Sequence, residues 1–347
     1  MLTETRWQSP SNIAIVKYWG KQLNQIPLNP SLSFTLSVCQ TDTKVFWRSR
    51  NSNDQSSFEF FLDGIPKPSF EPKILSFLQR IKGNFPWLPE YFLSIHSSNS
   101  FPHSSGIASS ASAMSALALN FCSFDQSVNC YQTMDTEHFI RKASQIARLG
   151  SGSACRSLFP YASIWGEHPG VRGSSNEFGI PSKSILHPCF KALQDYILIV
   201  SSKEKPVSSS AGHELMSHHL FKDQRIQQAS MNMTQLIECL GRDNWFDFIE
   251  IAEREALSLH ALMMTSQPSY ILLEPDSLRL IHEIRKLRSQ ENIPVGFTID
   301  AGPNIHLLFP SSETNKIEAW LASEFSEYLQ PGRLIRDRAG SGPLQII

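Results

Sequence analysis

The 347-residue sequence lacks the features that mark membrane and secreted proteins. No apolar stretch approaches the ~20 residues that span a bilayer. The first residues, Met1 to Arg6, lack the basic-then-apolar layout of a signal peptide. The six cysteines include no C-x-x-C pair, so we interpret most of them as small buried apolar residues in a reducing compartment. We therefore expect a cytoplasmic protein that does not associate with membranes.

An excess of charge of either sign is also missing. The 31 Lys and Arg residues nearly balance the 32 Asp and Glu residues, which leaves a net charge of −1. Nucleic-acid binding needs a basic excess that neutralises phosphates, so we expect no nucleic-acid partner. The sequence contains neither a G-x-x-x-x-G-K-[ST] phosphate loop nor a G-x-S-x-G nucleophile elbow. P-loop and serine-hydrolase chemistry are thereby excluded, whereas a local basic pocket for a small anion is not.

Hydrophobic periodicity predicts an α+β protein in two halves, with a break near residues 185–205. Apolar and polar residues alternate in the N-terminal part, and apolar residues then recur at helical spacing. The predicted strands are 12–21, 31–38, 43–47, 58–62, 91–95, 162–165, 196–200, 295–300 and 305–309. The predicted helical faces are 114–121, 139–147, 245–259, 278–287 and 317–325, and Gly150 is expected just beyond the second helix.

A segment rich in hydroxyl groups, Asn99 to Ala113, follows a predicted strand and opens a predicted helix. It reads Asn-Ser-Phe-Pro-His-Ser-Ser-Gly-Ile-Ala-Ser-Ser-Ala-Ser-Ala. The unpaired N–H groups and the positive dipole at a helix start favour an anion, and the hydroxyls can add donors or hold a metal ion. A serine-rich N-cap of a core helix explains the same composition, so both interpretations stand on the residues alone.

A second segment, Gly150-Ser151-Gly152-Ser153-Ala154-Cys155-Arg156, combines small residues with one guanidinium. Bare backbone N–H groups beside an arginine suit a carboxylate or a diphosphate. The segment is not a dinucleotide fingerprint, because its third glycine and a preceding strand are missing. A purely structural connection between helices is the alternative.

Two charged residues stand next to strongly apolar strands. Lys17 follows Ile13-Ala14-Ile15-Val16, where a buried ammonium needs a partner anion, unless it snorkels from an edge strand. Asp300 follows Phe297-Thr298-Ile299 and precedes a Gly-Pro turn. Catalytic acids often lie at strand ends, but aspartate before a turn is also ordinary turn chemistry.

Five segments, in their order along the chain, together resemble the GHMP kinase superfamily and, within it, the diphosphomevalonate decarboxylase family. They are Asn12-Ile13-Ala14 with Lys17-Tyr18-Trp19-Gly20-Lys21, Ser31-Leu32-Ser33, residues 101–110, residues 150–157, and Asp300-Ala301-Gly302-Pro303-Asn304. They cover the chain from residue 12 to residue 304, and the pieces around Arg156 and Asp300 are the most specific.

The resemblance implies a two-domain GHMP kinase fold and an ATP- and Mg²⁺-dependent decarboxylase. The N-terminal domain, residues 1–190, would resemble domain 2 of ribosomal protein S5 and carry the ATP-phosphate and substrate anion loops. The C-terminal domain, residues 191–347, would be ferredoxin-like and carry Asp300. The implied reaction converts mevalonate 5-diphosphate into isopentenyl diphosphate, CO₂, phosphate and ADP, and a homodimer is expected.

The resemblance also implies residue roles. Asp300 would be the acid/base at the substrate's 3-hydroxyl, with Lys17 as its cationic partner, and Arg156 with Asn12 would hold the substrate carboxylate. The implied diphosphate ligands are Tyr18, Lys21, Ser151, Gly152, Ser153 and Ser209. The implied ATP ligands are Asn99, Ser104, Ser105, Gly106, Ala108, Ser109 and Ser110, and the last two would also supply hydroxyls to Mg²⁺.

Two departures from the family pattern affect these expectations. His103-Ser104-Ser105 stand where relatives usually carry Thr-Ala-Ala, and Ser210 stands where some bacterial members carry an arginine for the diphosphate. Two alternatives follow: a related kinase or decarboxylase that acts on mevalonate or its monophosphate, and a non-catalytic relative that senses a ligand. The retained Lys17, Asp300 and Arg156 favour the decarboxylase.

Overall fold

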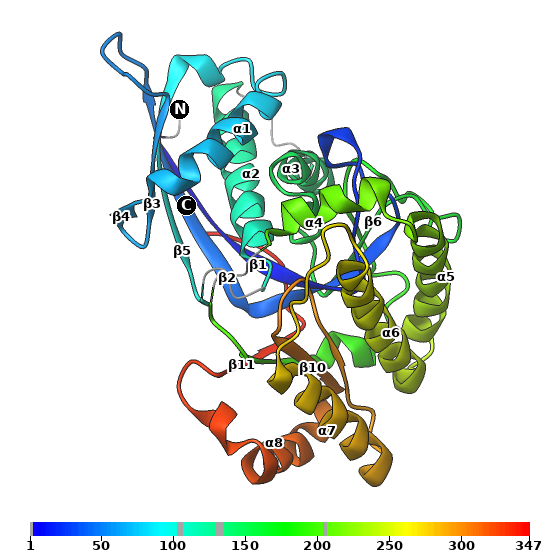
Figure 1. Cartoon of the computed structure of the whole chain (residues 1–347). Helices are drawn as coiled ribbons and strands as arrows, with labels where there is room; N and C mark the ends of the chain where they lie inside the picture. The colour runs from blue at the N-terminus through cyan, green and yellow to red at the C-terminus, as the bar shows by residue number, and fades with distance from the viewer. Residues whose placement is uncertain (1–2, 103–106, 130–134, 204–206) are drawn as a thin grey trace.

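The structure is a computed structural model that describes residues 3–102, 107–129, 135–203 and 207–347. Its first half is built on an eight-stranded sheet (Figure 1). Six strands follow the order β12-β1-β2-β5-β3-β4, β6 pairs with β2, and β7 pairs with β6. Its strands are β1 (Glu4–Val16), β2 (Ser31–Ser49), β3 (Phe58–Leu62), β4 (Ile65–Pro66), β5 (Tyr91–Asn99), β6 (Ala162–Trp165), β7 (Ile180–Pro181) and β12 (Leu344–Gln345). The strands predicted separately at 31–38 and 43–47 are one strand, β2, because the chain between them stays paired with β1.

Three helices pack on this sheet: α1 (Glu71–Ile81), α2 (Ser109–Val128) and α3 (Thr136–Gly150). The core between them is aromatic, and the Trp47 ring stacks on Phe124 with centroids 4.1 Å apart. Gly150, expected just beyond α3, is instead its last residue. A side chain there would collide with Met114, whose sulfur lies 2.6 Å from the position of a Cβ atom, so close helix packing requires the glycine.

The second half contains an antiparallel sheet with the order β11-β8-β10-β9. Its strands are β8 (Leu193–Leu198), β9 (Gly296–Thr298), β10 (Ile305–Pro310) and β11 (Leu334–Arg338), and its helices are α4 (Ser209–Leu215), α5 (Lys222–Gly241), α6 (Trp245–Met264), α7 (Pro275–Glu291) and α8 (Thr314–Glu324). In Figure 1, α7 and α8 lie at the lower end of the molecule and α5 and α6 at its side. The sequence did not predict α5, because glutamine, serine and asparagine interrupt its apolar positions.

The expected α+β class is confirmed by these two sheets and their helices. The last residues return to the first sheet, since Gln345 of β12 pairs with Trp7 of β1. Because the end of the chain belongs to the first sheet, the strands do not divide cleanly at one position, and the expected domain boundary between residues 190 and 191 stays a prediction. Within the described residues, every helix is too short or too polar to cross a bilayer.

Candidate active site

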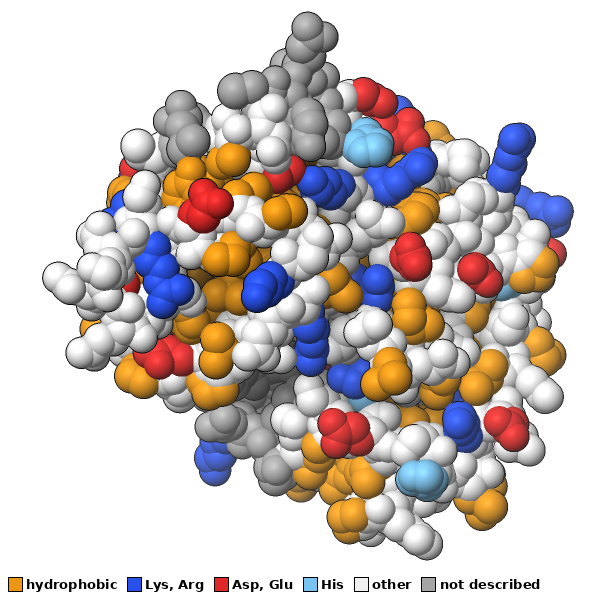
Figure 2. All heavy atoms as spheres, turned by 90° about the horizontal axis from the view of Figure 1, so that it is seen from above, with side chains coloured by type: hydrophobic (Ala, Val, Ile, Leu, Met, Phe, Trp, Pro, Cys, Tyr) orange, Lys and Arg blue, Asp and Glu red, His pale blue; other side chains and the backbone are white. Residues whose placement is uncertain are grey.

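A cavity of about 660 Å³ opens where the two halves meet, lined by residues of both. Among the described residues, its charged lining consists of four basic side chains and one acidic one: Lys17, Lys21, Lys73, Arg156 and Asp300. Figure 2 shows Lys and Arg side chains interspersed with apolar ones across one face of the molecule. A concave site with this excess of positive charge suits a ligand that carries several negative charges.

Lys17 and Asp300 form an ion pair at the base of this cavity. Lys17 is 1% exposed, and its Nζ lies 2.6 Å from Asp300 Oδ1. The snorkelling alternative is therefore wrong. The Asp300 side chain keeps 25% of its surface exposed, against 2% for Lys17, so the carboxylate is the member that faces a ligand.

Burial and pairing act on this pair in opposite directions. Burial lowers the pKa of Lys17, against the attraction of Asp300. Burial alone would raise the pKa of Asp300, but the nearby Lys17 ammonium outweighs it and lowers that pKa below its usual value. Asp300 is consequently ionised at neutral pH, and both of its carboxylate oxygens can accept hydrogen bonds.

Buried polar residues of the second half fix the backbone of this pair. Glu255 accepts a hydrogen bond from the Lys17 N–H at 2.8 Å, and Arg225, which pairs with Glu255 at 2.6 Å, donates to the Lys17 carbonyl. His260 donates from Nε2 to the Asp300 carbonyl at 3.1 Å. Sequence reasoning missed all three residues. The signal was present for Glu255 and His260, because they interrupt the apolar pattern of α6.

Arg156 lies at the end of a short 3₁₀ helix, η4 (Gly152–Arg156), and is 2% exposed. Its Nη1 donates to Ser31 Oγ, whereas its buried Nε has no hydrogen-bond partner. No carboxylate within the described part of the chain lies at ion-pair distance from it. A buried guanidinium with an unused donor is costly unless a ligand anion completes it.

Asn12 does not have the geometry expected of a carboxylate donor. Its amide nitrogen donates to the Ser153 carbonyl at 3.2 Å and to Ser157 Oγ at 2.8 Å. Reversing the amide would set its oxygen against the Ser153 carbonyl, so this orientation is fixed. Only the amide oxygen is left without a partner, and an acceptor cannot bind a carboxylate. Asn12 instead anchors η4, which positions Arg156.

The residues expected to bind a diphosphate all line the cavity: Tyr18, Lys21, Ser151, Gly152, Ser153 and Ser209. Tyr18 has a buried hydroxyl with no hydrogen-bond partner. A Cβ atom at Gly152 would lie 2.6 Å from that hydroxyl, so glycine is required where η4 passes Tyr18. Burial lowers the pKa of Lys21.

His213 is a further lining residue that the sequence did not assign to the site. Its Nδ1 accepts a hydrogen bond from the Gly20 N–H at 2.9 Å, and its ring packs 4.3 Å from the Tyr18 ring. Burial, with the charges of Lys21 and Arg156, lowers the pKa of His213 to about 3. The ring is therefore neutral, and its proton is on Nε2. In the sequence, His213 stands five residues before His218, a spacing that places the two on different helix faces and does not suit a shared metal ion.

The start of α2 forms another wall of the cavity. Ala108 precedes the helix in the left-handed conformation (φ 47°), and Ser110 Oγ donates to Ser151 Oγ at 3.0 Å. The expected ATP ligands Asn99, Ala108, Ser109 and Ser110 line the cavity, whereas Ser104, Ser105 and Gly106 lie outside the described residues. Sequence reasoning missed Lys73 of α1, whose Nζ donates to Ser110 Oγ at 3.0 Å.

The hydroxyls of Ser109 and Ser110 are hard oxygen donors of the kind that Mg²⁺ accepts. The only carboxylate in the described lining is Asp300, which is paired with Lys17. A magnesium ion here would depend on phosphate oxygens of a ligand for most of its coordination. Apolar lining residues of β3, β5, α1 and the turn before α1 offer a surface for a flat aromatic group: Phe60, Leu62, Phe70, Ile74 and Ile95.

Two family models cover most of the chain. Residues 9–175 match the diphosphomevalonate decarboxylase-like N-terminal domain, and residues 196–339 match the mevalonate 5-diphosphate decarboxylase C-terminal domain. The diphosphomevalonate decarboxylase of Aspergillus fumigatus is 31% identical over 88% of this chain and 77% of its own length. That of Gibberella zeae is 30% identical over 89% of this chain and 81% of its own length.

Solved structures agree over the whole chain. Mevalonate diphosphate decarboxylase from Staphylococcus aureus matches with 25% identity and a TM-score of 0.84, over 100% of this chain and 99% of that one. A structure of MDDEF in complex with MVAPP, AMPPCP and magnesium matches with 27% identity and a TM-score of 0.82, over 99% of both chains.

Proposed function

Because the chain belongs to the diphosphomevalonate decarboxylase family, we propose that its basic cavity is the site where mevalonate 5-diphosphate is phosphorylated and decarboxylated. The chain is an enzyme, an ATP-dependent decarboxylase of isoprenoid biosynthesis. The observation that carries the assignment of the site is the Lys17–Asp300 ion pair, with an exposed carboxylate, beside an Arg156 that lacks a counterion.

The chemistry accounts for each of these residues. A tertiary alcohol is a poor leaving group, so its 3-hydroxyl is phosphorylated first. Asp300 would accept the hydrogen bond, and then the proton, of that hydroxyl as the oxygen attacks the phosphoryl group. Lys17 would keep Asp300 ionised and stabilise the negative charge that develops nearby. When phosphate leaves, C3 becomes electron-deficient, and loss of CO₂ supplies the electron pair of the new alkene.

Arg156 would hold the substrate carboxylate until this last step. Its unpartnered Nε and its fixed Nη1 present the guanidinium as a planar donor. Asn12 would contribute only indirectly, because its amide hydrogens anchor η4. The low pKa of Asp300 fits a base that acts mainly by orientation, since phosphoryl transfer requires little proton abstraction before the transition state.

ATP and Mg²⁺ would occupy the wall formed by α2 and α1. Lys73 and the hydroxyls of Ser109 and Ser110 are suited to the triphosphate, and the apolar lining of β3, β5 and α1 is suited to the base. Magnesium, when bound, neutralises charge on the phosphates. A cytoplasmic location and a homodimer stay predictions.

His213 would donate a hydrogen bond from Nε2 to the substrate diphosphate. It lies in α4 one helical turn after Ser210, the position where some bacterial relatives carry an arginine, and it lines the cavity with Tyr18 and Lys21.

A hydrogen bond to a charged group contributes roughly 1.5–3 kcal/mol. His213→Met should therefore raise KM for the diphosphate substrate about 10- to 100-fold, with little change in kcat or in KM for ATP. His218→Gln, which alters an exposed neighbour, is the control. An unchanged KM would remove His213 from the diphosphate site.

A coupled assay that follows ADP and CO₂ tests the whole assignment. We expect both products from mevalonate 5-diphosphate and neither from mevalonate or its monophosphate. ADP without CO₂ would indicate a kinase, and release of both products from the monophosphate would redirect the assignment to a monophosphate decarboxylase. Ligand binding without either product would indicate a sensing protein.

A further inference from the structure

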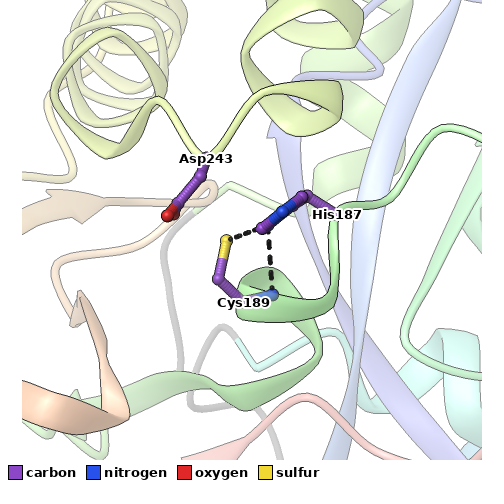
Figure 3. Close-up of side chains that lie close together, drawn as sticks. All are labelled: His187, Cys189 and Asp243. Atoms are coloured by element: carbon purple, nitrogen blue, oxygen red, sulfur yellow. Dashed lines mark hydrogen bonds between the residues drawn. The ribbon is translucent and has the colours of Figure 1, made fainter.

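Three side chains with metal-binding atoms converge outside the cavity. His187 precedes the short 3₁₀ helix η5 (Pro188–Ala192), Cys189 lies in its first turn, and Asp243 lies in the loop between α5 and α6. Figure 3 shows the three side chains turned toward one another from these two segments. One ligand atom from each lies within 4.8 Å of the others, and none of these residues lines the active-site cavity.

A ring nitrogen and a sulfur of this cluster are already in contact. His187 Nδ1 accepts the Cys189 backbone N–H at 3.4 Å, so this nitrogen is unprotonated and lies 3.1 Å from Cys189 Sγ. The ligand atom of Asp243 lies within 4.8 Å of both. A cation bound between the three residues would contact a sulfur, a nitrogen and an oxygen ligand at once.

The backbone around the cluster is already fixed. The His187 N–H donates to the Leu240 carbonyl at 2.7 Å, which ties the segment before β8 to the end of α5. Tetrahedral zinc with bonds of 2.0–2.3 Å holds its ligand atoms roughly 3.3–3.8 Å apart. Sulfur and nitrogen are already near that separation, and Asp243 is exposed, so its carboxylate is free to rotate inward.

We propose that His187, Cys189 and Asp243 bind one divalent cation of the zinc class, with water as the fourth ligand. The ion would replace the thiol proton, which is released to solvent, and bond to thiolate sulfur, imidazole nitrogen and carboxylate oxygen. This mixed N/S/O set selects against magnesium, which prefers oxygen ligands, so the site is distinct from the nucleotide's metal. Its role is structural: it joins the segment that enters the second sheet to the α5–α6 connection.

Cobalt(II) is the probe for the first test, because thiolate-to-cobalt charge transfer reports sulfur ligation directly. Chelator-treated full-length protein should bind one Co²⁺ with a near-ultraviolet charge-transfer band, release one proton per ion at neutral pH, and lose the band on addition of Zn²⁺. Cys189→Ser should abolish the band, and His187→Gln and Asp243→Asn should each weaken binding at least tenfold. Cys239→Ser and His282→Gln are the matched controls and should bind like the unaltered chain.

Thermal unfolding provides the second measurement. Zinc should raise the Tm of the unaltered chain and of the controls but not that of Cys189→Ser, and all variants should keep their kcat, which verifies folding. A charge-transfer band that survives in Cys189→Ser, or the absence of saturable cobalt binding to the folded unaltered chain, would overturn the proposal. Neither result would affect the assignment of the active site.

Discussion

Asp300 and Lys17 show how burial changes the chemistry of a single pair of side chains. Either residue alone at this depth would be driven toward its neutral form, and together they stay charged at 2.6 Å. Asp300→Asn keeps the shape but removes the charge and basicity, so we expect kcat to fall by roughly 10²- to 10⁴-fold with little change in KM. Lys17→Met should also lower kcat, and the double variant should show far less than the sum of the two effects.

Nucleotide binding is the control for these variants, because ATP is assigned to other residues. Equilibrium binding of ATP should survive in all three variants. Near-normal CO₂ release by Asp300→Asn would contradict the mechanism. Loss of ATP binding alone would move Asp300 to the nucleotide or metal side of the site.

The pH profile should show the lowered pKa of Lys17. Because burial lowers this pKa, Lys17 loses its proton at a lower pH than an ordinary lysine, whose pKa is 10.5. The charge that supports Asp300 is then lost, so kcat should fall on the alkaline side below pH 10.5. Lys17→Arg should have a lower kcat, but a guanidinium stays charged, so the alkaline limb of this variant should move to higher pH. An alkaline limb at the same pH in both enzymes would assign it to another group.

The sequence predicted the cavity residues that stand out locally and missed those that depend on distant contacts. Lys17 and Asp300 were recognisable because a charge adjoins an apolar strand. Glu255 and Lys17 are 238 positions apart, and only the fold brings them together. The contacts of Asn12 were equally hidden from the sequence, since Ser153 and Ser157, which use its amide hydrogens, lie more than 140 positions away.

At the scale of elements, the end of β1 is held by α5 and α6. The fully buried Arg225–Glu255 pair hydrogen-bonds both the N–H and the carbonyl of Lys17. Removing one charge of a buried pair costs roughly 3–5 kcal/mol, because the other charge is left uncompensated. We expect Glu255→Gln to lower the free energy of unfolding by that amount in urea titrations.

Activity should change with stability in this variant. At temperatures where Glu255→Gln is folded, its kcat should still be reduced, because the backbone of Lys17 has lost its anionic anchor. Glu327→Gln breaks an exposed pair with Arg279 and should cost less than about 1 kcal/mol. A Glu255→Gln enzyme with normal stability would show that the buried pair does not hold β1.

For the molecule as a whole, the order of the sequence motifs predicted more of the fold than the hydrophobic periodicity did. Alternation and helical spacing identified many strands and the helices α2, α3, α6, α7 and α8. They divided β2 into two strands and missed α1, α4 and α5. Local patterns also contain no information on the return of β12 to β1, which depends on where the two halves pack. The family resemblance predicted the fold because its motifs lie in both halves.

The contact between the two sheets leads to a last prediction, about Asp337 of β11. This aspartate is 1% exposed and accepts hydrogen bonds from the backbone N–H groups of Ser37, Val38 and Cys39 in β2 at 2.7–2.8 Å. Asp337→Asn would replace one acceptor with an amide that faces these donors, which leaves buried N–H groups unpaired at a cost of about 3 kcal/mol. Urea unfolding should show that loss, and the tryptophan-rich first half should then unfold separately from the second. Asp276→Asn, at an exposed position, should change neither property. A single transition at the original midpoint in Asp337→Asn would show that the hydrophobic core, rather than this carboxylate, couples the two sheets.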